Sequence, residues 1–117
     1  MVNENDEFPL YVVVDPKLES QFGLEGGIMK IHPPGMDPVM AIFTDEDLAR
    51  RFCEDLRRPD AIAQPIYRLE DMLRIAEFFR NNGVDNVARD ISFHPPTIQT
   101  TSMAIFIDSI RREPKKQ

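Results

Sequence analysis

The chain has 117 residues, of which 42% are hydrophobic and 29% are charged, and its formal net charge is −6. This length suits one domain, because two domains would each be left with a marginal hydrophobic core. The excess of acidic residues opposes the electrostatic attraction that dominates nucleic-acid binding, so we expect no nucleic-acid partner.

The cysteine content and the N-terminal sequence point to a compartment. Cys53 has no second cysteine with which to form an internal disulfide or a multi-cysteine zinc site, and it lies in an amphipathic stretch where a small buried side chain is expected. The start, MVNENDEF, has no signal-peptide pattern, and no apolar run approaches the roughly 18 residues of a membrane helix. We therefore expect a cytoplasmic protein without a membrane partner.

The first part of the chain is expected to form short strands. Residues 8–14, FPLYVVV, combine aromatic and β-branched side chains and predict a buried strand. Residues 18–27 hold three of the five glycines, which favours a loop. Residues 27–32 and 39–43 predict a hairpin-like pair of strands around a proline-rich turn at residues 33–38.

A helix is expected from Thr44 to Arg58. The Thr44 hydroxyl would accept a hydrogen bond from the amide of Asp47, and Pro59 would end the helix. Five apolar residues repeat at helical spacing and should pack on the sheet: Leu48, Ala49, Phe52, Cys53 and Leu56.

The second half of the chain continues this alternation of strand and helix. Residues 64–69 predict a strand, and residues 70–83 predict a helix that points four apolar side chains inward: Met72, Leu73, Ala76 and Phe79. Gly83 is expected to take the left-handed conformation of a Schellman motif, with Val84 making the accompanying hydrophobic contact.

The last segments complete the predicted domain. Residues 85–93 predict a strand, and the apolar spacing of residues 100–112 favours a helix over a strand. The alternation implies parallel neighbouring strands with right-handed crossovers beside an antiparallel pair. We predict one small α/β (α+β) domain at residues 8–112, with a mixed sheet of about four to five strands and about three helices, between a disordered segment at residues 1–7 and a basic tail at residues 113–117.

The two histidines raise the question of a metal site, because His32 and His94 each precede two prolines. Proline pairs stiffen the ends of strands, which accounts for most of this repetition. A shared ion would need both imidazoles about 2 Å from it, with carboxylates such as Asp37 or Asp90 completing the shell. No pattern fixes that convergence, so we predict no metal site and keep His32, His94 and Asp90 as weak candidates.

The sequence contains no catalytic signature. The hydroxyls and the thiol follow no nucleophile-elbow or triad pattern, and the glycine-rich stretch at residues 23–27 reproduces neither the dinucleotide-binding motif nor the Walker motif. We therefore predict no catalytic residue, no cofactor-binding residue and no cofactor, and we do not expect an enzyme.

Four arginines recur seven residues apart on the expected helix and are our candidates for binding a partner protein: Arg50, Arg51, Arg57 and Arg58. They could form a basic strip for an acidic partner. Three acidic residues precede arginines by four positions, which is typical of a solvated face with ion pairs worth about 0.3–0.5 kcal/mol each: Glu46, Asp47 and Glu54. Both interpretations stay open at this point.

Residues 39–56, VMAIFTDEDLARRFCEDL, contain a strand that ends in Phe-Thr and an acidic turn that opens a helix. This arrangement resembles the SseB-like N-terminal domain, a small bacterial α/β module, and the order of elements fits from Leu10 to Pro96. Four residues carry most of the likeness: Phe43, Thr44, Glu46 and Leu48. The resemblance implies a bacterial protein linked to serine sensitivity or secretion, with no established enzymatic activity and no catalytic residues to transfer.

The expected function is a non-catalytic protein-interaction or regulatory module that binds another protein. The alternative is a small-molecule or metal-binding regulator, or an enzyme, with a site at the strand ends near His32 and His94. Homo-oligomerisation is a further possibility, because an unpaired edge strand leaves backbone donors and acceptors available to a second copy.

Overall fold

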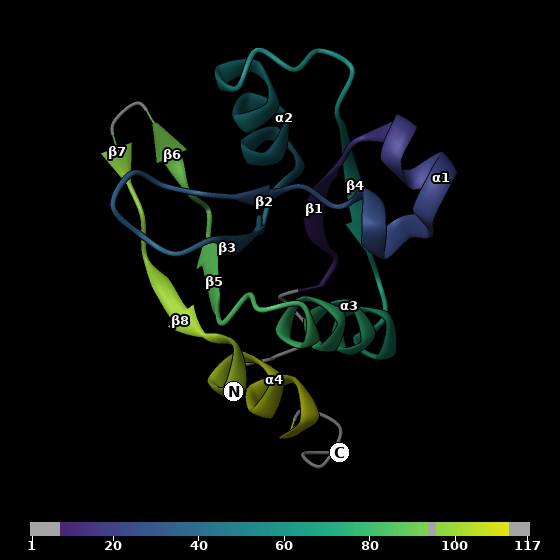
Figure 1. Ribbon diagram of the computed structural model, residues 1–117, viewed down its shortest axis with the longest axis vertical. Helices are drawn as coiled ribbons and strands as arrows, with labels where there is room; N and C mark the ends of the chain where they lie inside the picture. The colour runs from purple at the N-terminus through teal and green to yellow at the C-terminus, as the bar shows by residue number, and fades with distance from the viewer. Residues whose placement is uncertain (1–7, 94–95, 113–117) are drawn as a thin grey trace.

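The computed structural model describes residues 8–93 and 96–112 of the chain. Our predictions for residues 1–7, for His94 and for residues 113–117 concern parts of the chain outside these ranges. Within the described ranges the chain forms four helices, a mixed four-stranded sheet and two two-stranded sheets, which confirms the predicted α+β class (Figure 1).

The strands are short and pair in both directions. Those in the described ranges are β1 (Leu10–Val14), β2 (Lys30–Ile31), β3 (Val39–Ile42), β4 (Ile62–Ile66), β5 (Asn86–Arg89), β6 (Ser92–Phe93), β7 (Pro96–Thr97) and β8 (Thr100–Ser102). β1 pairs antiparallel with β4, and β2 and β3 form an antiparallel hairpin. β5 lies parallel to β3 and antiparallel to β8, while β6 and β7 form a separate antiparallel pair.

β1 connects the two-stranded β1–β4 sheet to the four-stranded sheet at the open end of the β2–β3 hairpin. Its Tyr11 exchanges backbone hydrogen bonds of 2.8 and 2.9 Å with Phe43, and the amide of Met29 donates to the Val13 carbonyl at 2.8 Å. The strand beside β4 is the buried β1, which runs antiparallel to it. The prediction that β4 has parallel neighbours is therefore wrong, and the parallel pair is formed by β3 and β5.

Helices cover both faces of the sheets. They are α1 (Pro16–Gly27), α2 (Glu46–Asp55), α3 (Leu69–Asn81) and α4 (Met103–Arg112). α2 packs on one face, where Phe52 and Phe43 belong to one hydrophobic cluster. α3 and α4 pack on the other face, where Met72, Phe106 and Val12 belong to a second cluster (Figure 1).

α1 occupies the segment that the glycine content predicts to be a loop, so that prediction is wrong. The helix begins at Pro16, and the Asp15 carboxylate accepts hydrogen bonds from the amides of Lys17 and Leu18 at 2.9 and 3.4 Å. Gly23, with φ of 84° and ψ of 176°, is not helical, so α1 consists of two helical segments with a kink between them. An aspartate followed by proline is a strong helix start, and here this start outweighs the glycines.

α2 begins one residue later than expected, after Asp45. The Asp45 carboxylate accepts a hydrogen bond from the amide of Asp47 at 2.7 Å, so the prediction of Thr44 as the N-cap is wrong. Thr44 instead donates its amide and its hydroxyl to the two carboxylate oxygens of Asp90, each at 2.8 Å. The predicted apolar stripe is confirmed: Ala49, Phe52 and Cys53 are buried, and Leu48 and Leu56 are half-buried.

α3 ends as the sequence predicts. Gly83 has φ of 87°, its amide donates to the Arg80 carbonyl at 3.2 Å, and the amide of Val84 donates to the Phe79 carbonyl at 2.9 Å. This is the hydrogen-bond pattern of a Schellman motif, and Val84 is buried against the core. Farther along, the predicted strand at residues 85–93 is interrupted after β5, and the predicted final helix is confirmed from Met103 onward.

Candidate functional site

Of the three weak metal candidates, the structure describes His32 and Asp90. His32 is exposed at the end of β2, and Asp90 uses both carboxylate oxygens to hold Thr44 at the start of α2. Residues 8–93 and 96–112 contain no group of three or more His, Cys, Asp or Glu side chains that could hold a metal ion. Asp90 therefore has a structural role here, in a left-handed conformation with φ of 55°.

Cys53 is a buried part of the α2 interface, as predicted. Cys53 is 6% exposed to solvent and belongs to the hydrophobic cluster beneath α2. Burial raises the pKa of the thiol. Because the thiolate is the reactive form of cysteine, this environment favours a packing role over a nucleophilic one.

The four candidate arginines do not form one strip along a helix. α2 ends at Asp55, and Arg57 adopts a left-handed conformation with φ of 58°, so the last two arginines lie beyond the helix. Arg50 pairs with Glu46 on α2 at 2.5 Å, whereas Arg58 pairs with Asp15 before α1. The expected Glu54–Arg58 pairing is replaced by this tertiary contact.

Arg58 connects the end of α2 to the start of α1. It donates to the Asp15 carboxylate at 2.7 Å and to the Asp60 carboxylate at 3.1 and 3.2 Å. The Arg58 hydrogen bonds lower the pKa of Asp15 and the pKa of Asp60, because the guanidinium group stabilises their charged forms. Arg58 thus acts first as a structural link in this fold.

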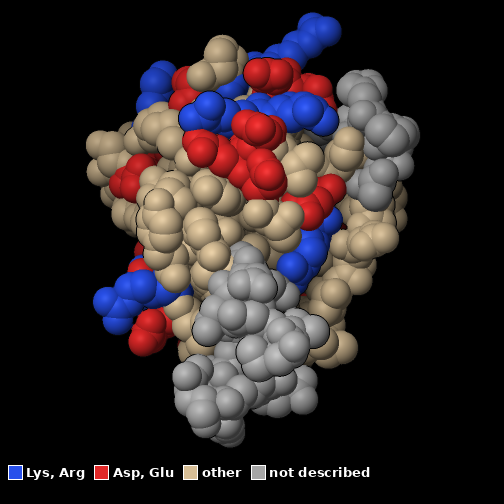
Figure 2. Space-filling model, turned by 180° about the vertical axis from the view of Figure 1, so that it is seen from behind, with Lys and Arg blue, Asp and Glu red and all other residues tan. Residues whose placement is uncertain are grey.

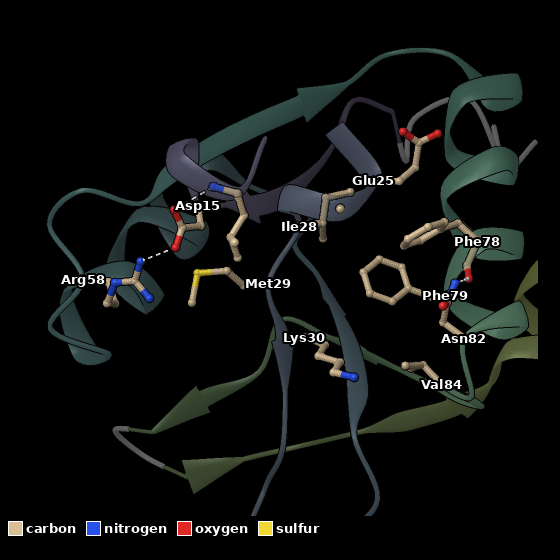
Figure 3. Close-up of a pocket in the computed structure, with 12 residues that line it drawn as sticks. Asp15, Glu25, Ile28, Met29, Lys30, Arg58, Phe78, Phe79, Asn82 and Val84 are labelled. Carbon is tan, nitrogen blue, oxygen red and sulfur yellow. Dashed lines mark hydrogen bonds and ion pairs between the residues drawn. The ribbon is translucent and has the colours of Figure 1, made fainter. Parts of the chain in front are cut away.

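A hollow of about 410 Å³ lies between α1, the start of β2 and the C-terminal end of α3 (Figure 3). We call it the α1–α3 groove. Its walls are largely apolar and come from Leu18, Ile28, Met29, Phe78, Phe79 and Val84. A volume of this size lies within the roughly 300–1,000 Å³ of ligand pockets.

Two wall residues keep much of their apolar surface in contact with solvent. Leu18 is 41% exposed and Phe78 is 37% exposed, while the neighbouring Phe79 is 4% exposed. Phe22 of α1 does not line the groove and is 68% exposed. Clustered exposed apolar side chains are typical of binding surfaces, whereas scattered single ones are common on any protein.

The charged residues at the two ends of the groove are held in ion pairs. Asp15 binds Arg58 at one end, and Figure 3 draws this contact. At the other end Glu25 binds Arg74 of α3 at 2.6 Å, and Arg74 also binds Asp71 at 2.9 Å. The hydrogen bond from Arg74 lowers the pKa of Glu25. These contacts fix α1 on the rest of the fold, and Lys30 and Asn82 add polar groups to a lining that is otherwise largely apolar.

Sequence reasoning missed the groove because it missed α1. Leu18 belongs to the segment predicted as a loop, and a loop has no helical spacing from which an apolar face could be predicted. Phe78 carried a weak signal: it is a large apolar residue beside, and not among, the expected inward positions of the helix at Met72, Ala76 and Phe79. The Asp15–Pro16 dipeptide was the second signal, since it marks a helix start.

Within the described residues no helix is long and apolar enough to cross a lipid bilayer. Comparison with protein-family models gives no match to the chain, and comparison with curated proteins gives no significant match.

Proposed function

We propose that this chain is a non-catalytic protein-interaction module that binds a partner through the α1–α3 groove. The observation that carries the proposal is the exposure of Leu18 and Phe78 on the walls of a hollow of about 410 Å³. Covering these two side chains would contribute about 1 kcal/mol each, because part of each is already buried. A partner that inserts an apolar side chain between them would gain this contribution.

The charged groups around the groove suit binding better than catalysis. A general acid or base works best with a pKa near the working pH. The ion pairs with Arg58 and Arg74 lower the pKa of Asp15 and of Glu25, away from neutrality. Both carboxylates are thus suited to holding α1 in place, which gives the groove a rigid wall.

The resemblance to the SseB-like N-terminal domain agrees with a non-catalytic role and is part of the same proposal. On this basis we propose a bacterial, cytoplasmic protein that acts by binding a protein partner. The arginine candidates fit less well in this proposal, because Arg50 and Arg58 are engaged in ion pairs within the chain. The groove is therefore preferred as the contact surface.

The proposal is tested by affinity capture with the tagged full chain and quantitative mass spectrometry. The groove variant is Leu18→Ser with Phe78→Ser. The matched control is Ile62→Ser with Ile105→Ser, which changes two residues that are 45% and 61% exposed outside the groove. We expect a stoichiometric partner that the control retains and the groove variant loses.

Thermal unfolding of both variants must accompany the capture, so that loss of the partner is not mistaken for loss of the fold. The proposal is wrong if the folded groove variant retains the partner, if both variants lose it equally, or if the wild-type chain captures no stoichiometric partner.

A further inference from the structure

A second surface lies at the start of β1, the connection from β4 to α3 and the start of α2, outside the groove. Two hollows of about 340 and 380 Å³ meet there and share Phe8 and Pro9. We call this region the aromatic–acidic surface, because one hollow contains aromatic and apolar side chains and the other contains carboxylates.

The apolar half of this surface is lined by aromatic and aliphatic side chains. Tyr67 and Leu69 complete the hollow beside Phe8 and Pro9, and Tyr67 is 68% exposed. An exposed tyrosine ring offers its face to an apolar side chain or to a cation, and a cation over the ring gains about 0.5–1 kcal/mol at such a site. The apolar half can therefore bind either an apolar side chain or a cationic side chain of a peptide.

The acidic half adjoins it at the start of α2. Asp45, Glu46 and Asp47 line the second hollow together with Tyr11. Arg50 compensates Glu46, while within the described residues Asp47 makes no ion pair. Burial and the nearby Glu46 carboxylate raise the pKa of Tyr11, which agrees with a phenol facing this negative charge.

In Figure 2 acidic and basic side chains gather together at the end that α2 occupies in Figure 1, and largely uncharged surface lies below them. A ligand that bridges the two hollows meets the carboxylates of Asp45 and Asp47 on one side and aromatic and apolar side chains on the other. Charge complementarity then favours a cationic group beside an apolar one.

We infer that the aromatic–acidic surface binds a basic peptide segment of a partner protein, with a Lys or Arg side chain at the carboxylates and a neighbouring apolar side chain beside Tyr67. The two hollows share Phe8 and Pro9, so side chains close together in one extended segment reach both. This site does not depend on the α1–α3 groove, whose carboxylates are already bound by arginines.

The test is a selection from a random dodecapeptide library displayed on phage, with the full chain immobilised. The wild type is expected to enrich peptides that carry Lys or Arg near a proline, leucine or aromatic residue. The affinity of a selected synthetic peptide should fall at least about tenfold between about 0.1 M and about 1 M NaCl, since salt screens exposed charges.

Three variants make this test specific. The acidic variant combines Asp45→Asn, Glu46→Gln and Asp47→Asn. It removes the negative charge, keeps an N-cap residue and should lower the affinity for the peptide about tenfold or more. The control variant combines Asp37→Asn, Glu54→Gln and Asp85→Asn at three other exposed carboxylates. Its net charge changes by the same amount, and it should bind the peptide with the affinity of the wild type. Tyr67→Ser should also weaken the peptide.

The inference is overturned if the library yields no binding peptide, if the selected peptides lack basic residues, or if the acidic variant and its control bind equally. The groove variant Leu18→Ser with Phe78→Ser should retain peptide binding, and its failure to do so would assign the peptide to the groove. None of these results decides whether the groove captures its own partner.

Discussion

The α1–α3 groove and the aromatic–acidic surface both expose apolar side chains, yet they differ in how their carboxylates are bound. In the groove, Asp15 and Glu25 are each hydrogen-bonded by an arginine. On the aromatic–acidic surface, the Asp45 carboxylate caps α2 and Asp47 is exposed. The contrast teaches that the number of charged residues does not identify a charged binding site, because their pairing within the fold decides what is left for a partner.

The comparison predicts different salt dependences for the two surfaces. Binding in the groove should depend mainly on buried apolar area and change little with salt, whereas binding at the aromatic–acidic surface should weaken as salt rises. Four changes to the chain test the structural basis of this contrast, from the largest expected effect on stability to the smallest.

Phe52→Ala tests how α2, which carries the acidic residues, is anchored. Phe52 is 2% exposed and its ring lies 5.2 Å from that of Phe43, so the change should lower the free energy of unfolding by about 3–5 kcal/mol. Phe78→Ala, at a 37% exposed groove residue, should cost about 1–2 kcal/mol. Urea denaturation measures both, and equal losses would contradict the division between a core anchor and a binding wall.

Asp90→Ala tests the hydrogen bonds that hold Thr44 in place just before α2. The change removes both hydrogen bonds to Thr44 and leaves an alanine at φ of 55°, so it should cost about 2 kcal/mol. Asp90→Asn should cost less, because asparagine tolerates this conformation and can still accept from the Thr44 amide. A stability unchanged by Asp90→Ala, measured by urea denaturation, would exclude the structural role.

Gly83→Ala tests the end of α3, where Val84 contributes to the groove wall. Space around Gly83 is open, so the cost is that of φ at 87° for a residue with a Cβ, about 1 kcal/mol. Gly83→Asn should be milder, because asparagine also occupies this helix-ending position. Thermal unfolding of the two variants measures the difference, and an alanine variant as stable as the wild type would contradict the expected strain.

Asp15→Asn tests the ion pair with Arg58 that joins the start of α1 to the end of α2. The Arg58 hydrogen bond lowers the pKa of Asp15 in the folded chain, so the stabilisation is present above the unfolded value of about 3.9 and disappears as pH falls through the lower folded pKa. The variant keeps an N-cap residue, and its loss of stability should be the smallest of the four. Denaturation from about pH 7 to about pH 2 should show the difference narrowing on the acid side, and a constant difference would contradict this cause.

Sequence reasoning was most accurate where the structure depends on neighbouring residues. The buried residues of α2 and the Schellman ending of α3 followed from spacing and from a single glycine. The same kind of reasoning failed at α1, because the glycines were given more weight than the start at Asp15 and Pro16. Each of these features was nevertheless present in a few consecutive residues.

The sequence by itself determined the α+β class, the apolar faces of α2 and α3, and the buried state of Cys53, because periodicity, capping and burial of apolar side chains act locally. The sequence also predicted the local pair of Glu46 with Arg50, but only the tertiary structure decided which charges pair over long distances in the chain. Arg58 meets Asp15 across 43 residues, Thr44 meets Asp90 across 46, and Arg74 meets Glu25 across 49. Such contacts depend on how β1 and the helices are arranged around the sheet, and this arrangement makes one surface an apolar groove and leaves the other acidic.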